Sequence, residues 1–496
     1  MSEGYSSYRQ IMKATSIFGG VQVFNIIISI IRSKFVALLL GPAGMGIMGL
    51  LTSTTGIIGN LTNFGLGTSA VKDIAAVFGT ENEKRIGVVI TVVRRLTWIT
   101  GMFGLLAVVL LSPWLSQLTF GNKNYTIAFV WISVTLLFNQ LSSGQLVVLQ
   151  GLRKLNYLAK ANLSGSFTGL FITVPIYYFW GLDGIVPGII STSVISLLMS
   201  WYFSGKVKVE KAVVSRSQTF AEGKNMLKMG FMISLNGMLV LGASFIISIF
   251  ISRTGSVDQV GLYNAGFVII NTYVSLIFNA MSTDYYPRLS AVSNDNKLCK
   301  QTINQQTEIA LLILAPILIV FLIFINWIII LLYSNRFIEV NEMIQWAALG
   351  MFFKTIGWSV GFIFLAKGTI KLFFWNELIA TSYILGFNLI GYYFWGLTGL
   401  GLSFAVAYLI YTIQVFVVSK IKFGFNFDKS IISIFTIQFG LAVAGFLAVK
   451  LFSTLLTYTA GIILILFSCW FSLIQLNKRL GLIKLLNQYK QKIRIK

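Results

Sequence analysis

Long apolar stretches separated by short polar segments recur along the whole chain of 496 residues. Each stretch holds about 18 or more mostly apolar residues, which is enough for an α-helix to cross a hydrocarbon layer about 30 Å thick. Strands of a membrane barrel would give short alternating segments instead, and the sequence has none. The pattern therefore predicts an all-α polytopic membrane protein. The fourteen predicted spans cover residues 11–37, 43–66, 88–112, 123–149, 158–181, 185–205, 228–252, 258–284, 305–333, 340–366, 373–395, 397–420, 430–452 and 455–476.

Composition and charge agree with this reading. Apolar residues make up 56% of the chain and charged residues 11%, whereas soluble domains carry about 25% charged residues. With the N-terminus placed in the cytoplasm, 31 of the 38 basic residues fall in cytoplasmic segments, so the net charge of +23 follows the topology. This asymmetry is the positive-inside pattern, which predicts that both termini are cytoplasmic. Because the charge flanks spans and does not gather on one folded face, nucleic acid is not an expected partner.

Residue types that usually carry enzyme chemistry are scarce. The chain has no histidine and no GxxxxGK[ST] loop that would hold nucleotide phosphates. Cys299 and Cys469 fall on the cytoplasmic side or inside a span, so they imply no disulfide framework. We therefore predict no catalytic residue, no metal site and no cofactor.

One octapeptide occurs twice in nearly identical form. YYFWGLDG begins at Tyr177 and YYFWGLTG at Tyr392, 215 positions later, and each copy ends one predicted span and begins the next. The same offset relates Gly46 in LGPAGMGIMG to Gly261 in RTGSVDQVGLYNAG. Six spans separate the copies, and an even number returns the chain to the same side, so the halves are predicted to be parallel repeats. The alternative is that interfacial aromatic residues and glycine turns recur by chance.

The repeat predicts a domain organisation. The first six spans form an N-lobe over 1–205, and a basic cytoplasmic linker covers 206–228. A C-lobe with six spans covers 229–420, two further spans lie in 421–476, and 477–496 form a basic cytoplasmic tail. Bundles of two such lobes usually carry a substrate site between them near the middle of the membrane.

Three of the basic residues inside predicted spans are considered for a substrate site. Lys354 lies about 20 Å of helix from the cytoplasmic end, too far to reach the interface readily, so we expect it in a polar interior that binds substrate. A structural ion pair or a water contact is the alternative. Arg32 and Lys34 lie nearer a span end and could reach the external interface. Because residues two apart on a helix face different ways, at most one of them is expected to face the lobe interface, and Arg32 is the candidate.

Amides add a polar stripe to the eighth predicted span. Asn264, Asn271 and Asn279 are spaced by seven and eight residues, which places them on one helix face as candidate substrate-binding residues. Asp284 lies at the cytoplasmic end of the same span. Hydrogen bonding between helices is the alternative role for the amides. A weaker polar set in the fourth span comprises Asn139, Gln140 and Gln145.

Glu377 is the one acid well inside a predicted span. It is expected either to pair with Lys354 across neighbouring helices or to carry a coupling proton. The depths of the two residues differ by about 11 Å, so a direct pair would need extended side chains or a bridging water. Glu377 and Asp284 are therefore the candidate coupling or ion-pair residues.

Motifs in a fixed order carry a family resemblance. LGPAGMGIMG follows the first span, FGLGTSAVKDIA follows the second, and STDYYPRLS closes the eighth. Together with two lobes of six spans, they resemble the polysaccharide transporter branch of the multidrug/oligosaccharidyl-lipid/polysaccharide superfamily. Within this branch the chain is most similar to Wzx-type O-antigen translocases.

The resemblance implies a flippase for lipopolysaccharide biosynthesis in the bacterial inner membrane. Its cargo would be an undecaprenyl-pyrophosphate-linked oligosaccharide, moved from the cytoplasmic to the periplasmic leaflet by alternating access. It further implies coupling to H⁺ or Na⁺, contact with membrane lipids, and partner polymerase or chain-length proteins of the same pathway.

Two other functions remain open at this stage. A drug or cation antiporter of the same superfamily should have an acidic cavity, whereas the most central charge here is Lys354. A membrane enzyme acting on lipid-linked sugars would need a large external loop with paired acids or a histidine. Acids outside the spans are instead scattered over short turns.

Overall fold

The structure is a computed structural model that describes residues 2–78, 82–210 and 212–480. The predicted tail from residue 481 lies outside the described residues, as do the side chains of Asn279 and Asp284. Throughout the described ranges the regular secondary structure is helical. Within the described residues, ten helical stretches are long and apolar enough to cross a membrane. The chain is thus an all-α, multi-pass membrane protein, as predicted.

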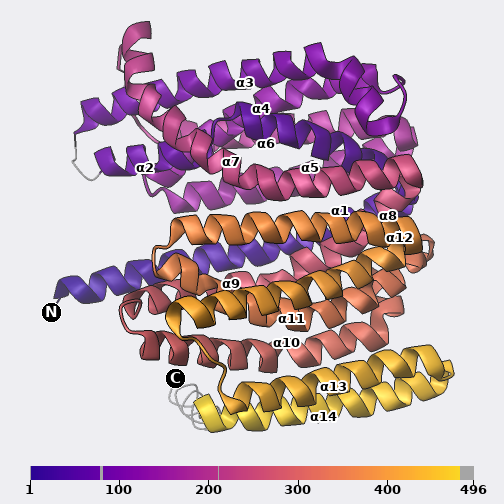
Figure 1. The fold of residues 1–496 in the computed structure, drawn as a ribbon. Coiled ribbons are helices and arrows are strands. Elements are labelled where there is room, and N and C mark those ends of the chain that lie inside the picture. Colours follow the sequence, from indigo (N-terminus) through magenta and orange to yellow (C-terminus); the bar gives the residue numbers. More distant parts are fainter. Residues whose placement is uncertain (1, 79–81, 211, 481–496) are drawn as a thin grey trace, which may run out of the picture. The chain divides into compact units, whose positions relative to one another are not determined.

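The chain divides into two compact units, and the long helices of each lie side by side (Figure 1). The first unit comprises Met1–Gly261 and Leu332–Ser334. Its helices are α1 (Ser2–Thr62), α2 (Leu66–Phe78), α3 (Glu83–Phe120), α4 (Thr126–Gly151), α5 (Leu155–Trp180), η1 (Gly181–Gly184), α6 (Ile185–Gly205) and α7 (Arg216–Thr254).

The second unit comprises Leu262–Leu331 and Asn335–Lys496, and α8 (Val257–Phe267) straddles the boundary. Its remaining helices are η2 (Val268–Val274), α9 (Ser275–Ala291), α10 (Asn296–Leu332), η3 (Asn335–Val340), α11 (Asn341–Ala366), α12 (Ile370–Phe423), α13 (Lys429–Leu451) and α14 (Thr454–Leu480). η2 is a π-helix, so the segment predicted as one regular span over 258–284 changes its helical register midway.

The helix α7 packs within the first unit, although the sequence places it at the start of the C-lobe. Near its beginning, Glu222 forms an ion pair with Arg85 of α3 at 2.6 Å. Further along, the backbone carbonyl of Ser234 accepts a hydrogen bond of 3.3 Å from Asn60 of α1. These contacts attach the first half of α7 to the first unit.

Three predicted pairs of spans follow one another without a loop, with a sharp kink between the two helices of each pair. The stretches Phe24–Thr62, Leu155–Gly205 and Lys371–Phe423 each contain two predicted spans. The kinks fall at glycines: Gly41 in α1, Gly181 after α5 and Gly396 in α12. Because each pair counts as one candidate, the fourteen predicted spans become eleven. The predicted span over 258–284 is divided into α8, η2 and α9 and gives no candidate, which leaves ten in the described part of the chain.

The repeated octapeptide has the same structure in both copies. Gly181 has φ 52° and ψ −128°, and Gly396 has φ 55° and ψ −138°, a conformation that only glycine adopts readily. The first tyrosine of each copy is buried, with exposed fractions of 1% for Tyr177 and 5% for Tyr392. The next three aromatic residues of each copy are exposed. This agreement is what the predicted internal repeat requires, and the exposed aromatic residues fit the membrane interface.

The second repeated motif brings two glycines together. A Cβ on Gly46 would lie 1.9 Å from the carbonyl oxygen of Val257, and one on Gly261 would lie 1.9 Å from that of Pro42. Pro42 and Val257 are themselves 215 positions apart. Each copy of the turn therefore packs its glycine against the backbone of the other copy.

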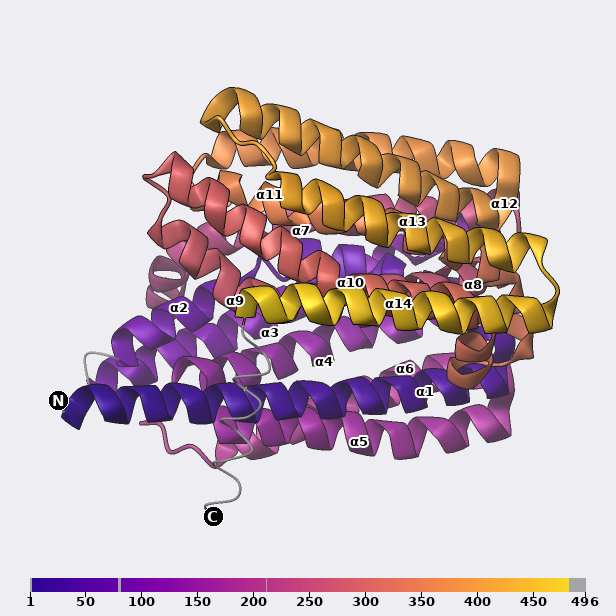
Figure 2. The ribbon, with the colours of Figure 1, turned by 90° about the horizontal axis from the view of Figure 1, so that it is seen from below.

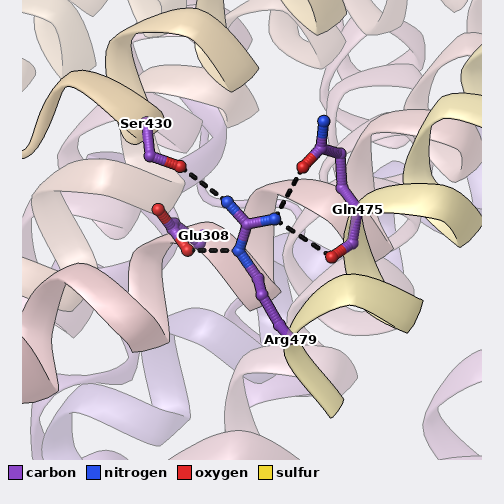
Figure 3. A network of polar contacts seen from close by, with 4 residues as sticks. All are labelled: Glu308, Ser430, Gln475 and Arg479. Atoms are coloured by element: carbon purple, nitrogen blue, oxygen red, sulfur yellow. Dashed lines mark hydrogen bonds and ion pairs between the residues drawn. The ribbon is translucent and has the colours of Figure 1, made fainter. Parts of the chain in front are cut away.

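The last two spans form an antiparallel pair in the second unit, visible in Figures 1 and 2. Arg479 near the end of α14 joins them to α10 through a 2.5 Å ion pair with Glu308 (Figure 3). The same guanidinium donates to the hydroxyl of Ser430 at the start of α13 at 2.6 Å. It also donates to Gln475 of α14, whose side-chain oxygen lies 2.7 Å away. One arginine thus ties three helices together at one end of the bundle.

Candidate functional site

A polar cavity of about 380 Å³ lies inside the first unit. Helix α1 supplies one wall with small polar residues and glycines that recur at helical spacing. α3, α4, α6 and α7 complete the lining. The lining residues are Thr52, Thr55, Gly56, Gly59, Asn60, Thr62, Asn63, Thr100, Gly101, Thr135, Leu136, Asn139, Gln140, Ser143, Ile189 and Leu241. None of them carries a charge.

The lining offers hydrogen bonds of both kinds. Thr55 and Thr62 of α1 donate their hydroxyl hydrogens to carbonyls one turn back, at 2.8 and 2.9 Å, so their oxygens can still accept. Gln140 donates one amide hydrogen to the hydroxyl of Thr100 at 2.8 Å and has a second to give. Neutral donors and acceptors around a small cavity suit a polyhydroxylated ligand such as a sugar.

Lys354 occupies a polar and aromatic setting in the second unit. Its Nζ donates to Oδ1 of Asn271, which lies in the π-helix η2, at 3.0 Å. The ammonium also lies 5.1 Å from the ring centre of Tyr408 and 5.6 Å from that of Phe404, both on α12. Aromatic faces attract a cation without neutralising its charge. Two residues predicted separately as substrate-binding are therefore in contact.

The internal repeat relates the cavity of the first unit to the surroundings of Lys354 in the second unit. Shifting Asn271, Lys354 and Phe404 back by 215 positions gives Gly56, Asn139 and Ile189. All three of the shifted positions line the cavity of the first unit. By this offset the cavity corresponds to most of the surroundings of Lys354, while Tyr408 shifts to Ser193, which is outside the lining. The residue at the position of Lys354 is the neutral Asn139.

Glu377 lies in a separate polar cluster of the second unit. The hydroxyl of Tyr411 donates to its Oε1 at 2.8 Å, and the amide of the adjacent Asn376 donates to it at 3.3 Å. Gln414 in turn donates to Asn376 at 2.8 Å. In the described part of the chain no basic side chain pairs with this carboxylate. The expected alternative of a direct pair with Lys354 is thus not the arrangement adopted here, and a coupling role remains a prediction.

The other predicted residues are dispersed. Arg32 of α1 donates to the hydroxyl of Thr192 on α6 at 2.8 Å and lies beside Tyr177, so it contacts its own unit. Asn264 lies half-buried on α8, before the π-helix that contains Asn271. Asn279 and Asp284 lie on α9 with side chains outside the described residues, so their proposed roles stay predictions.

Sequence reasoning missed most of the lining of the cavity. Thr, Ser and Gly have hydropathies near neutral, so their stripe on α1 does not interrupt an apolar span. The signal was nevertheless present in LTSTTGIIGNLTN, where polar or glycine positions recur at intervals of three and four. The aromatic partners of Lys354 and Glu377 were missed because tyrosine in a span resembles ordinary packing.

Comparison with known proteins gives the family. Residues 35–342 match the family described as "Polysaccharide biosynthesis protein". Because the match covers more than half of the chain, the protein belongs to this family. The lipid III flippase of Escherichia coli (strain K12) is 20% identical over 352 residues, which are 70% of this chain and 82% of that protein. The lipid III flippase of Shigella flexneri gives the same figures.

Solved structures give the fold. The lipid II flippase MurJ in an inward closed conformation aligns with a TM-score of 0.66 at 14% identity, covering 91% of this chain and 97% of that one. An inward-facing multidrug resistance transporter of the MATE family, in the MOP superfamily, aligns with the same TM-score at 15% identity. That alignment covers 81% of this chain and 94% of the transporter. The chain therefore shares the fold of these two transporters.

Proposed function

We propose that the protein is a flippase that moves an undecaprenyl-pyrophosphate-linked oligosaccharide between membrane leaflets by alternating access. The observation that carries this proposal is that the internal repeat relates the neutral cavity of the first unit to the surroundings of Lys354 in the second. One copy has a neutral cavity lined by hydroxyls and amides, and the other has Lys354 at the equivalent position. A lipid-linked oligosaccharide has the matching chemistry, since its sugars are neutral and its pyrophosphate is anionic.

Each part of the cargo has a physical requirement. Burying a phosphate in hydrocarbon is prohibitively costly unless a cation or hydrogen bonds replace water. Lys354 can exchange the amide oxygen of Asn271 for a phosphate oxygen, which forms a stronger, charge-assisted hydrogen bond. The hydroxyls of the cavity replace water around the sugar, while the polyprenyl tail stays in the lipid.

The direction follows from charge. With both termini in the cytoplasm of a bacterial inner membrane, as the basic residues predict, the membrane potential favours outward movement of anions. The gain is about 2.3 kcal/mol per charge for each 100 mV, or roughly 5 kcal/mol for a doubly charged pyrophosphate. Return of the empty carrier then needs another ion. Glu377, held by Tyr411 and Asn376, is the candidate to bind an inward-moving H⁺ or Na⁺.

The relatives support transport over enzyme chemistry, because those reported are named as flippases and transporters. A cation antiporter is the second possibility, since the fold is shared with a multidrug transporter. The positive charge of Lys354 in its aromatic surroundings disfavours a cationic ligand there. Polymerase and chain-length proteins of the same pathway are the proposed protein partners.

The test is transfer of a fluorescent undecaprenyl-pyrophosphate-linked oligosaccharide across proteoliposome membranes. We expect Lys354→Gln to lower the rate by about tenfold to a hundredfold, because a charged hydrogen bond contributes about 1.5–3 kcal/mol. The matched control is Lys371→Gln, which removes an exposed lysine at the start of α12. Wild-type transfer by Lys354→Gln would disprove the role of this residue. Absence of transfer by folded wild-type protein, with efflux of drug cations instead, would favour the antiporter.

The coupling ion is tested in the same vesicles. Imposed H⁺ and Na⁺ gradients should each be compared for wild type and Glu377→Gln. We expect one gradient to accelerate the wild type and to have no effect on the variant. Equal acceleration of both proteins would exclude Glu377 from coupling.

A further inference from the structure

A second cavity, of about 970 Å³, lies in the first unit, apart from the neutral one. It is bounded by α3, by the linker after α6 and by the first turns of α7. Three arginines line it: Arg94 and Arg95 from α3, and Arg216 from α7. Glu210 is the one acidic residue of the lining, so basic charge prevails.

Large apolar side chains border the same cavity. Trp98 and Ile99 follow the two arginines along α3, and Phe220 follows Arg216 along α7. About half of each side chain is exposed, with 53% for Trp98 and 57% for Phe220. The cavity therefore combines a cationic part with an apolar part.

The position along α3 sets the depth of this cavity. No charged residue occurs between Trp98 and Trp114, which are about 24 Å apart along the helix. Tryptophan gathers where hydrocarbon meets headgroups, so we expect these two residues to mark the borders of the membrane on α3, with the inner border at Trp98 and not at the start of the predicted span 88–112. Arg94 and Arg95 lie one turn beyond Trp98, at the depth of the lipid phosphates, on the side expected to be cytoplasmic.

Hydrogen bonds hold the cavity open in a defined shape. Arg95 donates from one guanidinium nitrogen to the carbonyl oxygen of Val214 at 2.5 Å and to the hydroxyl of Thr219 at 3.0 Å. The linker is thereby fixed against α3. Arg94 makes one long bond, of 3.4 Å, to Gln145. For Arg216 the described residues contain no hydrogen bond or ion pair, so its guanidinium is available to a ligand.

We propose that this cavity binds an anionic phospholipid. The phosphate would lie between Arg94 and Arg216, and an acyl chain would pass over Trp98 and Phe220. Basic residues at this depth attract the anionic lipids of the cytoplasmic leaflet. This site is separate from the cargo site and does not depend on the proposed transport function.

Quenching of tryptophan fluorescence by brominated lipids tests the proposal without a transport assay. The protein is placed in vesicles with equal amounts of phosphatidylglycerol and phosphatidylcholine, with bromine on the acyl chains of one lipid or of the other. Comparison with Trp98→Phe isolates the signal of Trp98 among the 11 tryptophans. We expect brominated phosphatidylglycerol to quench Trp98 more strongly than brominated phosphatidylcholine.

Two variants connect the preference to the arginines. Arg216→Gln should reduce the preference for phosphatidylglycerol about fivefold, as expected for one basic residue near the surface. Lys224→Gln, which removes an exposed lysine two turns along α7 and outside the cavity, should leave the preference unchanged. Equal quenching by the two lipids in wild type, or a preference that survives Arg216→Gln, would overturn the proposal. Loss of the preference in excess inorganic phosphate would assign the cavity to a soluble phosphate instead.

Discussion

Asn139 and Lys354 occupy the same position in the two copies of the internal repeat, yet only Lys354 carries a charge. Asn139 lines a neutral cavity in the first unit, and Lys354 bonds Asn271 in the second. Duplication supplied two equivalent places in one chain, and substitution then gave them different chemistry. A cargo with neutral and anionic portions can use both.

This difference predicts that the two places recognise different parts of the cargo. Asn139→Ala combined with Gln140→Ala should weaken binding of the lipid-linked oligosaccharide about tenfold, since each neutral hydrogen bond contributes about 0.5–1.5 kcal/mol. The same double variant should bind undecaprenyl pyrophosphate without sugar as wild type does. Lys354→Gln should weaken both. Binding curves for the two lipids make the comparison, with the exposed Asn124→Ala as control. A sugar-independent loss in the double variant would contradict the assignment.

The packed turns at Gly46 and Gly261 should tolerate no side chain. Alanine at either position would place a Cβ 1.9 Å from a backbone oxygen, so the backbone must move. We expect each substitution to lower the free energy of unfolding by about 3 kcal/mol, as for a severe overpacking change. Thermal unfolding in detergent measures this. Gly440→Ala is the control, because its new methyl group would meet open space and should not destabilise the protein. Similar melting temperatures for all three variants would refute the prediction.

The network at Arg479 should behave as a unit. Arg479→Gln leaves the carboxylate of Glu308, whose side chain is 11% exposed, without its charged partner, at a cost of about 3 kcal/mol. Adding Glu308→Gln removes that unpaired charge, so the double variant should lose less than the sum of the single ones. A double-mutant cycle from thermal unfolding gives the coupling. Additive losses would mean that the pair contributes nothing beyond each residue's own packing.

The ion pair between Arg85 and Glu222 gives the attachment of α7 a dependence on pH. The Arg85 guanidinium, hydrogen-bonded to Glu222, holds the pKa of that carboxyl below its ordinary value. Its stabilising contribution is therefore fully present above the unfolded pKa of about 4.3 and is lost as pH falls through the lower folded pKa. Hydrogen exchange corrected for intrinsic rate should show that the first turns of α7 lose protection below about pH 4. In Glu222→Gln, the first turns of α7 should have this lower protection at every pH. If the variant showed the same pH profile as wild type, the ion pair would not be the cause of the pH dependence.

The membrane fold could be predicted from sequence because hydropathy alone fixes where a chain can cross a bilayer. The repeat could also be predicted, since YYFWGL is conspicuous and its turn requires glycine at Gly181 and Gly396. The assignment of α7 to the first unit could not be predicted from the sequence. It depends on specific partners, such as Arg85 for Glu222, that lie far apart in the sequence.

The candidate site was predictable only in its most polar members. Lys354 and Asn271 are conspicuous within apolar spans, and their contact joins two spans that were considered separately. Thr55 and Thr62 were not conspicuous because a threonine can satisfy its hydroxyl within its own helix. The π-helix around Asn271 left no mark in the sequence pattern, since it changes the register without changing the composition.

The reciprocal packing of Gly46 on Val257 and of Gly261 on Pro42 has an evolutionary meaning. Two identical chains make this type of contact when they pair about a two-fold axis. The chain thus retains, within one polypeptide, the interface of a homodimer. A dimer of half-length chains built on this turn would make the same two contacts, related by its two-fold axis.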